Sequence, residues 1–185
     1  MTWHVLHLND VAPTPWRNGG GTTRELAVWP ETQNWVWRMS VAEVAQGGPF
    51  SAFPGVHRWF SVLSGAGVQL TIENRRHVLH DDTAPFDFDG DVPVDCQLLD
   101  DPTQDFNLMV KQGVGARMER LRVPFDRTLN TPKTIAVYAG NTGARVLFNT
   151  EVLTLEPQTL IWQHLPVGSQ FQVHAEHALW MEIDL

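Results

Sequence analysis

The chain has 185 residues, of which 43% are hydrophobic and 18% are charged, so it can bury the core of one large domain or two small ones. Its formal net charge of −8 argues against nucleic acid as a partner, because phosphate binding needs clustered lysines and arginines. The single cysteine, Cys96, excludes an intrachain disulfide.

The first ten residues, MTWHVLHLND, lack the basic start and the long apolar stretch of a secretory signal. No apolar run elsewhere approaches the roughly 20 residues that are needed to span a bilayer. We therefore expect a cytoplasmic protein without a membrane partner.

The segment PWRNGGGTTREL, residues 15–26, holds three consecutive glycines between two arginines. Glycine loses more conformational freedom on folding than any other residue, so this segment is either a flexible loop or a place of close backbone approach. It lacks the lysine of a phosphate-binding P-loop, which argues against nucleotide binding. Exposed glycine amides can still bind another small anion.

Two segments show strand alternation with one polar face. In NWVWRMSVAEV, Arg38 and Ser40 lie on the face opposite three large apolar side chains. In DFNLMV, Asp105 and Asn107 share a face, and the opposite face is fully apolar. Such a strand turns its polar face toward water or toward a polar cavity.

The remaining segments predict further strands. Residues 58–73 predict a β-hairpin around the turn Gly65-Ala66-Gly67, and Arg75-Arg76 is interpreted as the tip of another hairpin. Residues 113–123 suit a helical turn or an edge strand, and 125–133 suit a polar connector. The other strand-like segments recur about every 8–12 residues, which is typical of an all-β sandwich or barrel. They are 77–82, 94–101, 133–140, 144–149, 151–156, 159–165, 169–176 and 178–185.

Histidines come in three HxxH pairs, His4/His7, His77/His80 and His174/His177. In a strand, residues three apart point to opposite faces, so one strand cannot aim both at one ion. Surface or edge positions are therefore expected for them, and no metal or other cofactor is expected. The alternative is that different strands bring His57 together with His77 and His80.

Nucleophilic catalysis finds little support in the sequence. Cys96 lies in an alternating stretch and is interpreted as a small buried hydrophobe. No serine stands in a GxSxG elbow.

Three polar groupings remain as candidates for a site. They are the glycine-rich loop, the turn-rich segment 48–59 that leads to Arg58, and the polar strand faces. One explanation is structural: Asp105 pairs with Arg58 or Arg24, because unpaired burial of such groups costs several kcal/mol. The other is that they line a pocket for a small polar or anionic ligand, since arginine grips a carboxylate with two hydrogen bonds.

The sequence resembles the HutD/Ves family. The resemblance rests on four motifs in their expected order: PWRNGGGTTRE, WRMSVAEV, GPFSAFPGVHRWFSVLSG and DFNLMV. It implies an all-β bicupin, with one small jelly-roll-like barrel in residues 1–112 and another in 113–185, between which strands can be exchanged. Because cupins often dimerise through sheet edges, it also allows a homodimer.

The family resemblance implies a function as well. HutD-like members are associated with bacterial histidine-utilisation genes and are thought to bind a small acidic intermediate, such as formylglutamate or urocanate, in a regulatory role. Ves-like members are linked to stress or cold responses. The motifs place the following residues at the first-barrel pocket, either binding the ligand or bracing the loop: Arg17, Asn18, Thr22, Thr23, Arg24, Glu25, Arg38, Ser40, Arg58, Asp105 and Asn107.

The sequence departs from the metal-binding cupins in one respect. Their HxH-plus-Glu motif would fall in FPGVHRWFSVLSG, which contains only His57. A catalytic metal needs three or four ligands, so we expect a metal-independent small-molecule-binding protein. The alternative is a cupin enzyme that uses Glu25 or Asp105 as general acid or base, or a metal held by histidines.

Overall fold

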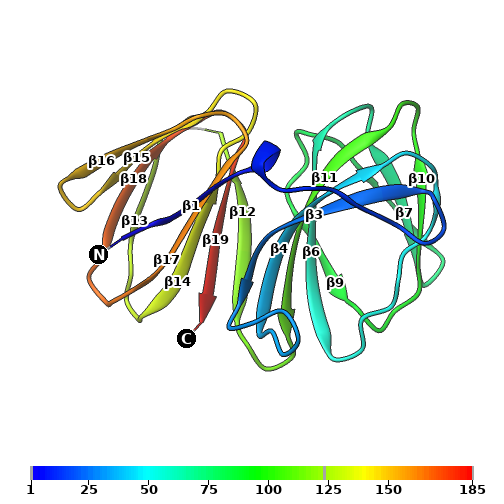
Figure 1. The fold of residues 1–185 in the computed structure, drawn as a ribbon, viewed down its shortest axis with the longest axis horizontal. Coiled ribbons are helices and arrows are strands. Elements are labelled where there is room, and N and C mark those ends of the chain that lie inside the picture. Colours follow the sequence, from blue (N-terminus) through cyan, green and yellow to red (C-terminus); the bar gives the residue numbers. More distant parts are fainter. Residues whose placement is uncertain (1, 123, 185) are drawn as a thin grey trace. The chain divides into compact units, whose positions relative to one another are not determined.

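The computed structural model describes residues 2–122 and 124–184, and these residues form strands with one 3-10 helix, η1 (Leu8–Asp10) (Figure 1). The all-β prediction is therefore confirmed. In the described part of the chain, no helix is long and apolar enough to cross a membrane. Met1, Val123 and Leu185, which belong to the segments predicted above, lie outside the described residues.

The chain divides into two compact units. One is Val11–Gly113, called here the N-terminal barrel; the other, the C-terminal barrel, comprises the described residues before and after it. The division between the two halves thus falls at Gly113. The first ten residues belong with the C-terminal barrel, where β1 (His4–His7) pairs with β17 (Thr159–Leu165).

The N-terminal barrel is built from two antiparallel sheets. The six-stranded sheet has the order β2-β3-β4-β11-β6-β9, and the four-stranded sheet has the order β5-β10-β7-β8. Between them lies a core that includes Phe60, Val62, Leu70 and Cys96. The bounds are β2 Thr14–Pro15, β3 Gly21–Trp29, β4 Trp37–Val44, β5 Gly48–Pro49, β6 Val56–Ser64, β7 Val68–Ile72, β8 Arg75–Leu79, β9 Phe86–Asp89, β10 Val94–Leu98 and β11 Thr103–Lys111.

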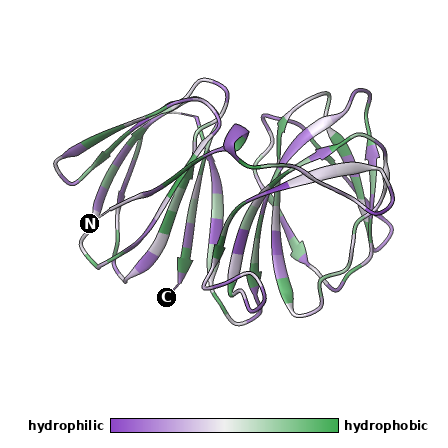
Figure 2. Ribbon diagram, viewed as in Figure 1, coloured by the Kyte–Doolittle hydropathy of each residue, from purple (hydrophilic) through white to green (hydrophobic). Residues whose placement is uncertain are grey.

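The C-terminal barrel has the same two-sheet construction. Its five-stranded sheet has the order β1-β17-β14-β19-β12, and its four-stranded sheet has the order β13-β18-β15-β16. Its core includes Val137, Ile161, Phe171 and Trp180. The remaining bounds are β12 Ala116–Leu121, β13 Phe125–Thr128, β14 Lys133–Tyr138, β15 Ala144–Phe148, β16 Glu151–Leu155, β18 Gln170–His174 and β19 Ala178–Asp184. The strands of both barrels carry hydrophobic and hydrophilic positions (Figure 2).

Two sequence expectations change in the structure. The predicted hairpin in residues 58–73 is wrong, because β6 and β7 belong to different sheets and do not pair. Gly65 and Gly67, with φ of 98° and 105°, turn the chain from one sheet to the other in a conformation that favours glycine. The segment 125–133, expected as a polar connector, instead contains the strand β13. For 113–123 the edge-strand alternative is confirmed, because β12 is an outer strand of the five-stranded sheet.

Two other expectations hold. Cys96 is 1% exposed and packs in the core as a small hydrophobe, and burial raises the pKa of its thiol to about 12. Arg75 pairs with Ile72 just after a tight turn, so the basic pair does begin the second strand of the β7–β8 hairpin.

Candidate functional site

The glycine-rich segment forms the tight turn between β2 and β3. Gly19 has a φ of 72°, in the left-handed region, and its amide donates to the Trp16 carbonyl oxygen at 3.0 Å. The Gly20 amide donates to Asn18 Oδ1 at 3.0 Å. A Cβ on Gly21 would clash with the Glu43 carbonyl oxygen of β4. These glycines therefore serve the turn and the approach of β3 to β4, and two of their amides are already used.

A cavity of about 670 Å³ lies in the N-terminal barrel. Its walls come from β4, β6 and β11, from residues at the β2–β3 turn, and from residues 49–53. Seven of the eleven predicted residues line it: Arg17, Asn18, Thr23, Arg38, Ser40, Arg58 and Asn107. The described lining contains three arginines and neither a carboxylate nor a histidine.

Strand register explains why these side chains meet. Ser40 of β4 stands opposite Asn107 of β11, and Asn107 stands opposite Phe60 of β6. Arg38 and Arg58 flank Met109 in the neighbouring row. Since side chains two apart on a strand share a face, these two rows point into the barrel together.

Arg58 is the most buried cation of the cavity, with 6% exposure. Its Nη2 donates to Asn107 Oδ1 at 3.1 Å, and its Cζ lies 5.4, 5.4 and 5.0 Å from the ring centroids of Phe50, Phe53 and Phe88. No described carboxylate forms an ion pair with it. Burial, and secondarily the charge of Arg38, lowers the Arg58 pKa to about 10, so the side chain keeps its charge at neutral pH.

Arg38 has one acidic neighbour. Its Nε lies 3.5 Å from Glu25 Oε2, and its Cζ lies 5.9 Å from the ring of Trp35. Glu25 itself does not line the cavity. The lining therefore keeps an excess of positive charge.

Two other predicted residues, Thr22 and Arg24 of β3, lie outside the cavity wall. Arg24 Nη1 donates to the Val11 carbonyl oxygen at 2.6 Å and approaches Glu43 at 4.0 Å. Thr22 and Arg24 alternate with Thr23, so they point away from the wall that Thr23 joins. Thr23 Oγ1 in turn accepts a hydrogen bond from Trp16 Nε1 at 2.8 Å, which braces the turn.

Asp105 is fully buried beside the cavity but does not line it. Thr103 Oγ1 donates to its Oδ2 at 2.8 Å. Burial raises the Asp105 pKa to about 7, although the Thr103 hydrogen bond acts in the opposite direction. Asp105 therefore pairs with neither Arg58 nor Arg24, and the structural pairing that the sequence left open is not formed. Because neither Glu25 nor Asp105 lines the cavity, this geometry does not favour acid–base catalysis by either.

The aromatic residues around Arg58 are absent from the sequence prediction. Phe50 and Phe53 follow β5, and Phe88 lies on β9, the neighbour of β6. The two phenylalanines in the turn-rich GPFSAFPG could have indicated this contact, because large apolar side chains in a loop usually pack against a neighbouring part of the protein.

The histidines do not gather at a metal site. His57 lies between two carboxylates, with Nδ1 2.8 Å from Asp89 Oδ1 and Nε2 3.0 Å from Asp87 Oδ2. His77 packs on Phe86, and the ring of His80 contacts the Ala66 carbonyl oxygen. The alternative that brings these three histidines together is therefore wrong. Among the described residues, no group of three or more His, Cys, Asp or Glu could hold a metal ion.

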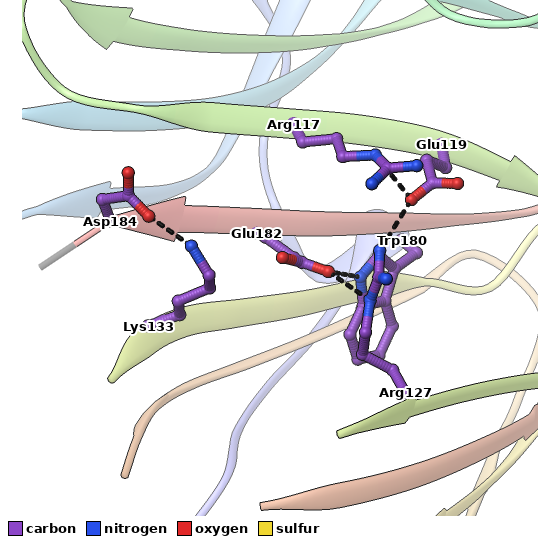
Figure 3. Close-up of polar contacts among 7 residues, drawn as sticks. All are labelled: Arg117, Glu119, Arg127, Lys133, Trp180, Glu182 and Asp184. Carbon is purple, nitrogen blue, oxygen red and sulfur yellow. Dashed lines mark hydrogen bonds and ion pairs between the residues drawn. The ribbon is translucent and has the colours of Figure 1, made fainter. Parts of the chain in front are cut away.

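The C-terminal barrel also has arginines near its buried polar groups, but these meet carboxylates (Figure 3). Arg127 of β13 contacts Glu182 Oε1 of β19 at 2.6 Å and Glu119 Oε1 of β12 at 3.1 Å. Arg117 contacts the same Glu119 oxygen at 2.7 Å, and Trp180 Nε1 donates to Glu182 at 3.0 Å. The charges in this network balance.

The class of protein follows from structures with the same fold. The chain superimposes on the cupin-type protein YlbA of E. coli with a TM-score of 0.73 over 99% of this chain and 91% of that one, at 9% identity. With two barrels of two sheets each, the chain has the bicupin fold that the sequence predicted.

The family follows from the sequence. The HutD family model matches residues 8–181, so the chain belongs to the HutD family. HutD from Pseudomonas fluorescens SBW25 aligns over 98% of both chains, with a TM-score of 0.82 and 28% identity. A conserved protein of unknown function from Pseudomonas aeruginosa PAO1 aligns over 100% of both, with a TM-score of 0.90 and 29% identity.

Curated relatives agree with this assignment. An uncharacterised 21.2 kDa protein of the hutC 3′ region of Pseudomonas putida is 32% identical over 77% of this chain and 76% of its own. Protein Ves of Cronobacter sakazakii is 37% identical over 66% of this chain and 68% of its own. The names of these relatives link the HutD family to the histidine-utilisation locus.

Proposed function

We propose that the N-terminal barrel binds a small acidic metabolite, such as formylglutamate or urocanate, and that the protein regulates histidine catabolism through this binding. One observation carries the proposal: the described cavity wall has three arginines and no carboxylate, and the deepest arginine, Arg58, is 6% exposed. A buried charge without a counterion is costly, and a bound anion would relieve that cost.

The chemistry of the wall supports a carboxylate rather than a purely apolar ligand. Guanidinium groups bind carboxylates through paired hydrogen bonds, and these bonds are stronger where water is excluded. Phe50, Phe53 and Phe60 supply apolar surface beside Arg58. A volume of about 670 Å³ falls in the usual range for small-molecule sites.

The relatives supply the metabolic context of the proposal. One is a protein of the hutC 3′ region of Pseudomonas putida, and another is HutD of Pseudomonas fluorescens. An arginine-lined cavity suits a carboxylate-bearing metabolite of histidine utilisation.

Calorimetric titration with N-formylglutamate, urocanate and glutamate tests the proposal. Arg58→Ala should weaken binding of the preferred ligand by about 1.5–3 kcal/mol, the usual loss for a hydrogen bond to a charged group. The control is Arg75→Ala, since Arg75 is exposed on the β7–β8 hairpin. If Arg58→Ala unfolds the barrel, Arg58→Lys keeps the charge and loses the paired geometry. Absence of binding below millimolar concentration, or unchanged binding in the Arg58 variants, would contradict the proposal.

A further inference from the structure

Asp105 is a buried ionisable group that the proposed site does not use. It lies on β11 two residues before Asn107, on the same inward-facing row. We propose that the N-terminal barrel takes up its anionic ligand together with a proton, and that the Asp105 carboxyl group holds this proton. The inference rests on the proposed function and adds a mode of regulation to the same site.

The surroundings of Asp105 suit a neutral carboxylic acid. The residue is 0% exposed, and Thr103 donates to Oδ2. Among the described residues, Oδ1 has no hydrogen-bond partner. An ionised carboxylate with one hydrogen bond is poorly compensated for the loss of water, whereas the neutral acid loses much less. Burial accordingly raises the Asp105 pKa to about 7.

The groups that face Asp105 come from three neighbouring strands. Ala42 of β4 and Val62 of β6 stand opposite it, and neither is charged. Cys96 of β10 lies close enough for the Asp105 charge to raise its thiol pKa, and that thiol stays neutral. On the inward-facing rows of the same two strands the charged groups are Arg38 and Arg58, farther along toward the cavity. The other ionisable groups of these strands, Glu43 and His57, lie at alternate positions and therefore point to the opposite face.

These arginines couple the ligand to the proton. A ligand carboxylate held by these arginines brings a negative charge to the inward-facing rows that Asp105 shares, and a negative charge nearby disfavours the ionised form of a second carboxyl group. Binding therefore raises the pKa of Asp105, and a proton enters where the carboxyl group was ionised. By linkage, affinity is constant well below pH 7 and falls as the pH rises through about 7, the Asp105 pKa.

Calorimetry on the full chain with N-formylglutamate tests this coupling, because the carboxylates of that probe stay ionised across the range used. Affinity should fall by about five- to tenfold between about pH 6 and about pH 8.5. Buffers of different ionisation enthalpy should reveal uptake of a fraction of one proton near neutral pH. Asp105→Asn should abolish both effects. Asp95→Asn is the matched control, since Asp95 is exposed on β10, and should keep both.

The outcomes separate this inference from the proposed function. Absence of binding at every pH overturns both. Binding with constant affinity and no proton uptake, or an Asp105→Asn variant that keeps the pH dependence, overturns the inference and leaves the proposed function intact. If Asp105→Asn does not fold, carbon NMR of the Asp105 carboxyl in the unmodified protein replaces it. Its titration midpoint should rise on adding N-formylglutamate, and an unmoved midpoint overturns the inference.

Discussion

The two barrels share a fold and place arginines beside their cores, but the groups that contact these arginines differ in charge. In the N-terminal barrel, Arg58 is held by Asn107 and three phenyl rings. In the C-terminal barrel, Arg127 meets Glu119 and Glu182. Two carboxylates neutralise the charge of Arg127, so it attracts a further anion only weakly. Arg58 contacts neutral groups, so its positive charge remains available to an anionic ligand.

The buried carboxyl groups differ in the same way. Glu182 accepts a hydrogen bond from Trp180 and forms an ion pair with Arg127, while Asp105 receives one hydrogen bond, from the Thr103 hydroxyl. Burial favours the neutral form of Asp105. The Glu182 carboxylate, in contrast, has a cationic partner in Arg127. A carboxyl-to-amide change should therefore have opposite effects in the two barrels.

The largest of these effects is expected for Asp105→Asn, with a gain of about 2–4 kcal/mol in unfolding free energy at about pH 8. The folded pKa is raised from 3.8 to about 7, so between these pH values the unfolded chain loses a proton that the barrel retains. Stability of the unmodified protein should fall across that window and level off above it. Urea unfolding at about pH 4 and about pH 8 measures this, and an equal difference at both would contradict it.

Asn107→Asp should give Arg58 an acidic partner, as Arg127 has in the C-terminal barrel. A carboxylate 3.1 Å from Arg58 Nη2 would neutralise the cation and weaken N-formylglutamate binding by about 10- to 100-fold. Asn34→Asp is the control, because Asn34 is an exposed amide that contacts Lys111. Equal calorimetric affinities in these two variants would show that the free charge of Arg58 does not matter.

Glu182→Gln should destabilise the C-terminal barrel by about 1–2 kcal/mol, since hydrogen bonds to a charged group exceed neutral ones by roughly that amount. The affinity of the N-terminal site for N-formylglutamate should not change. Denaturant unfolding gives the first quantity and calorimetry the second. If Glu182→Gln instead stabilised the protein, the expected opposite effects of the Glu182 and Asp105 substitutions would be contradicted.

The smallest effect concerns the aromatic side chains around Arg58. Phe88→Leu removes the nearest of the three rings, 5.0 Å from the guanidinium carbon, and should weaken binding by about two- to fivefold. Phe86→Leu on the same strand is the matched control, because Phe86 packs against His77. If both variants bind alike in calorimetry, the aromatic rings do not position Arg58.

Strand alternation made much of the fold predictable from the sequence. Regular segments such as 133–140 and 159–165 correspond to β14 and β17. β3 was missed because it starts at a glycine and a bulge between Glu25 and Ala27 breaks its alternation. The false hairpin at Gly65 shows that a turn signal does not say which sheet the next strand joins.

The site was predictable where it depended on local pattern. The faces of β4 and β11 correctly paired Arg38 with Ser40 and Asp105 with Asn107, since alternation alone decides them. Asn107 lines the cavity and Asp105 does not, although both lie on the same face of β11. This difference depends on what the opposite sheet places against each residue, which strand alternation does not reveal. The phenylalanines around Arg58 come from segments 35 to 38 residues apart in the chain, which no local pattern connects.

The proposed function depends on Arg58 of the N-terminal barrel receiving a ligand carboxylate, and a crystal structure of the protein with N-formylglutamate would show this contact. We expect a carboxylate oxygen at about 2.7–3.2 Å from a guanidinium nitrogen of Arg58, with the ion pairs of Arg127 unchanged. A ligand bound only outside this cavity, with Arg58 still contacting only Asn107, the Ser51 carbonyl oxygen and the phenyl rings, would contradict it.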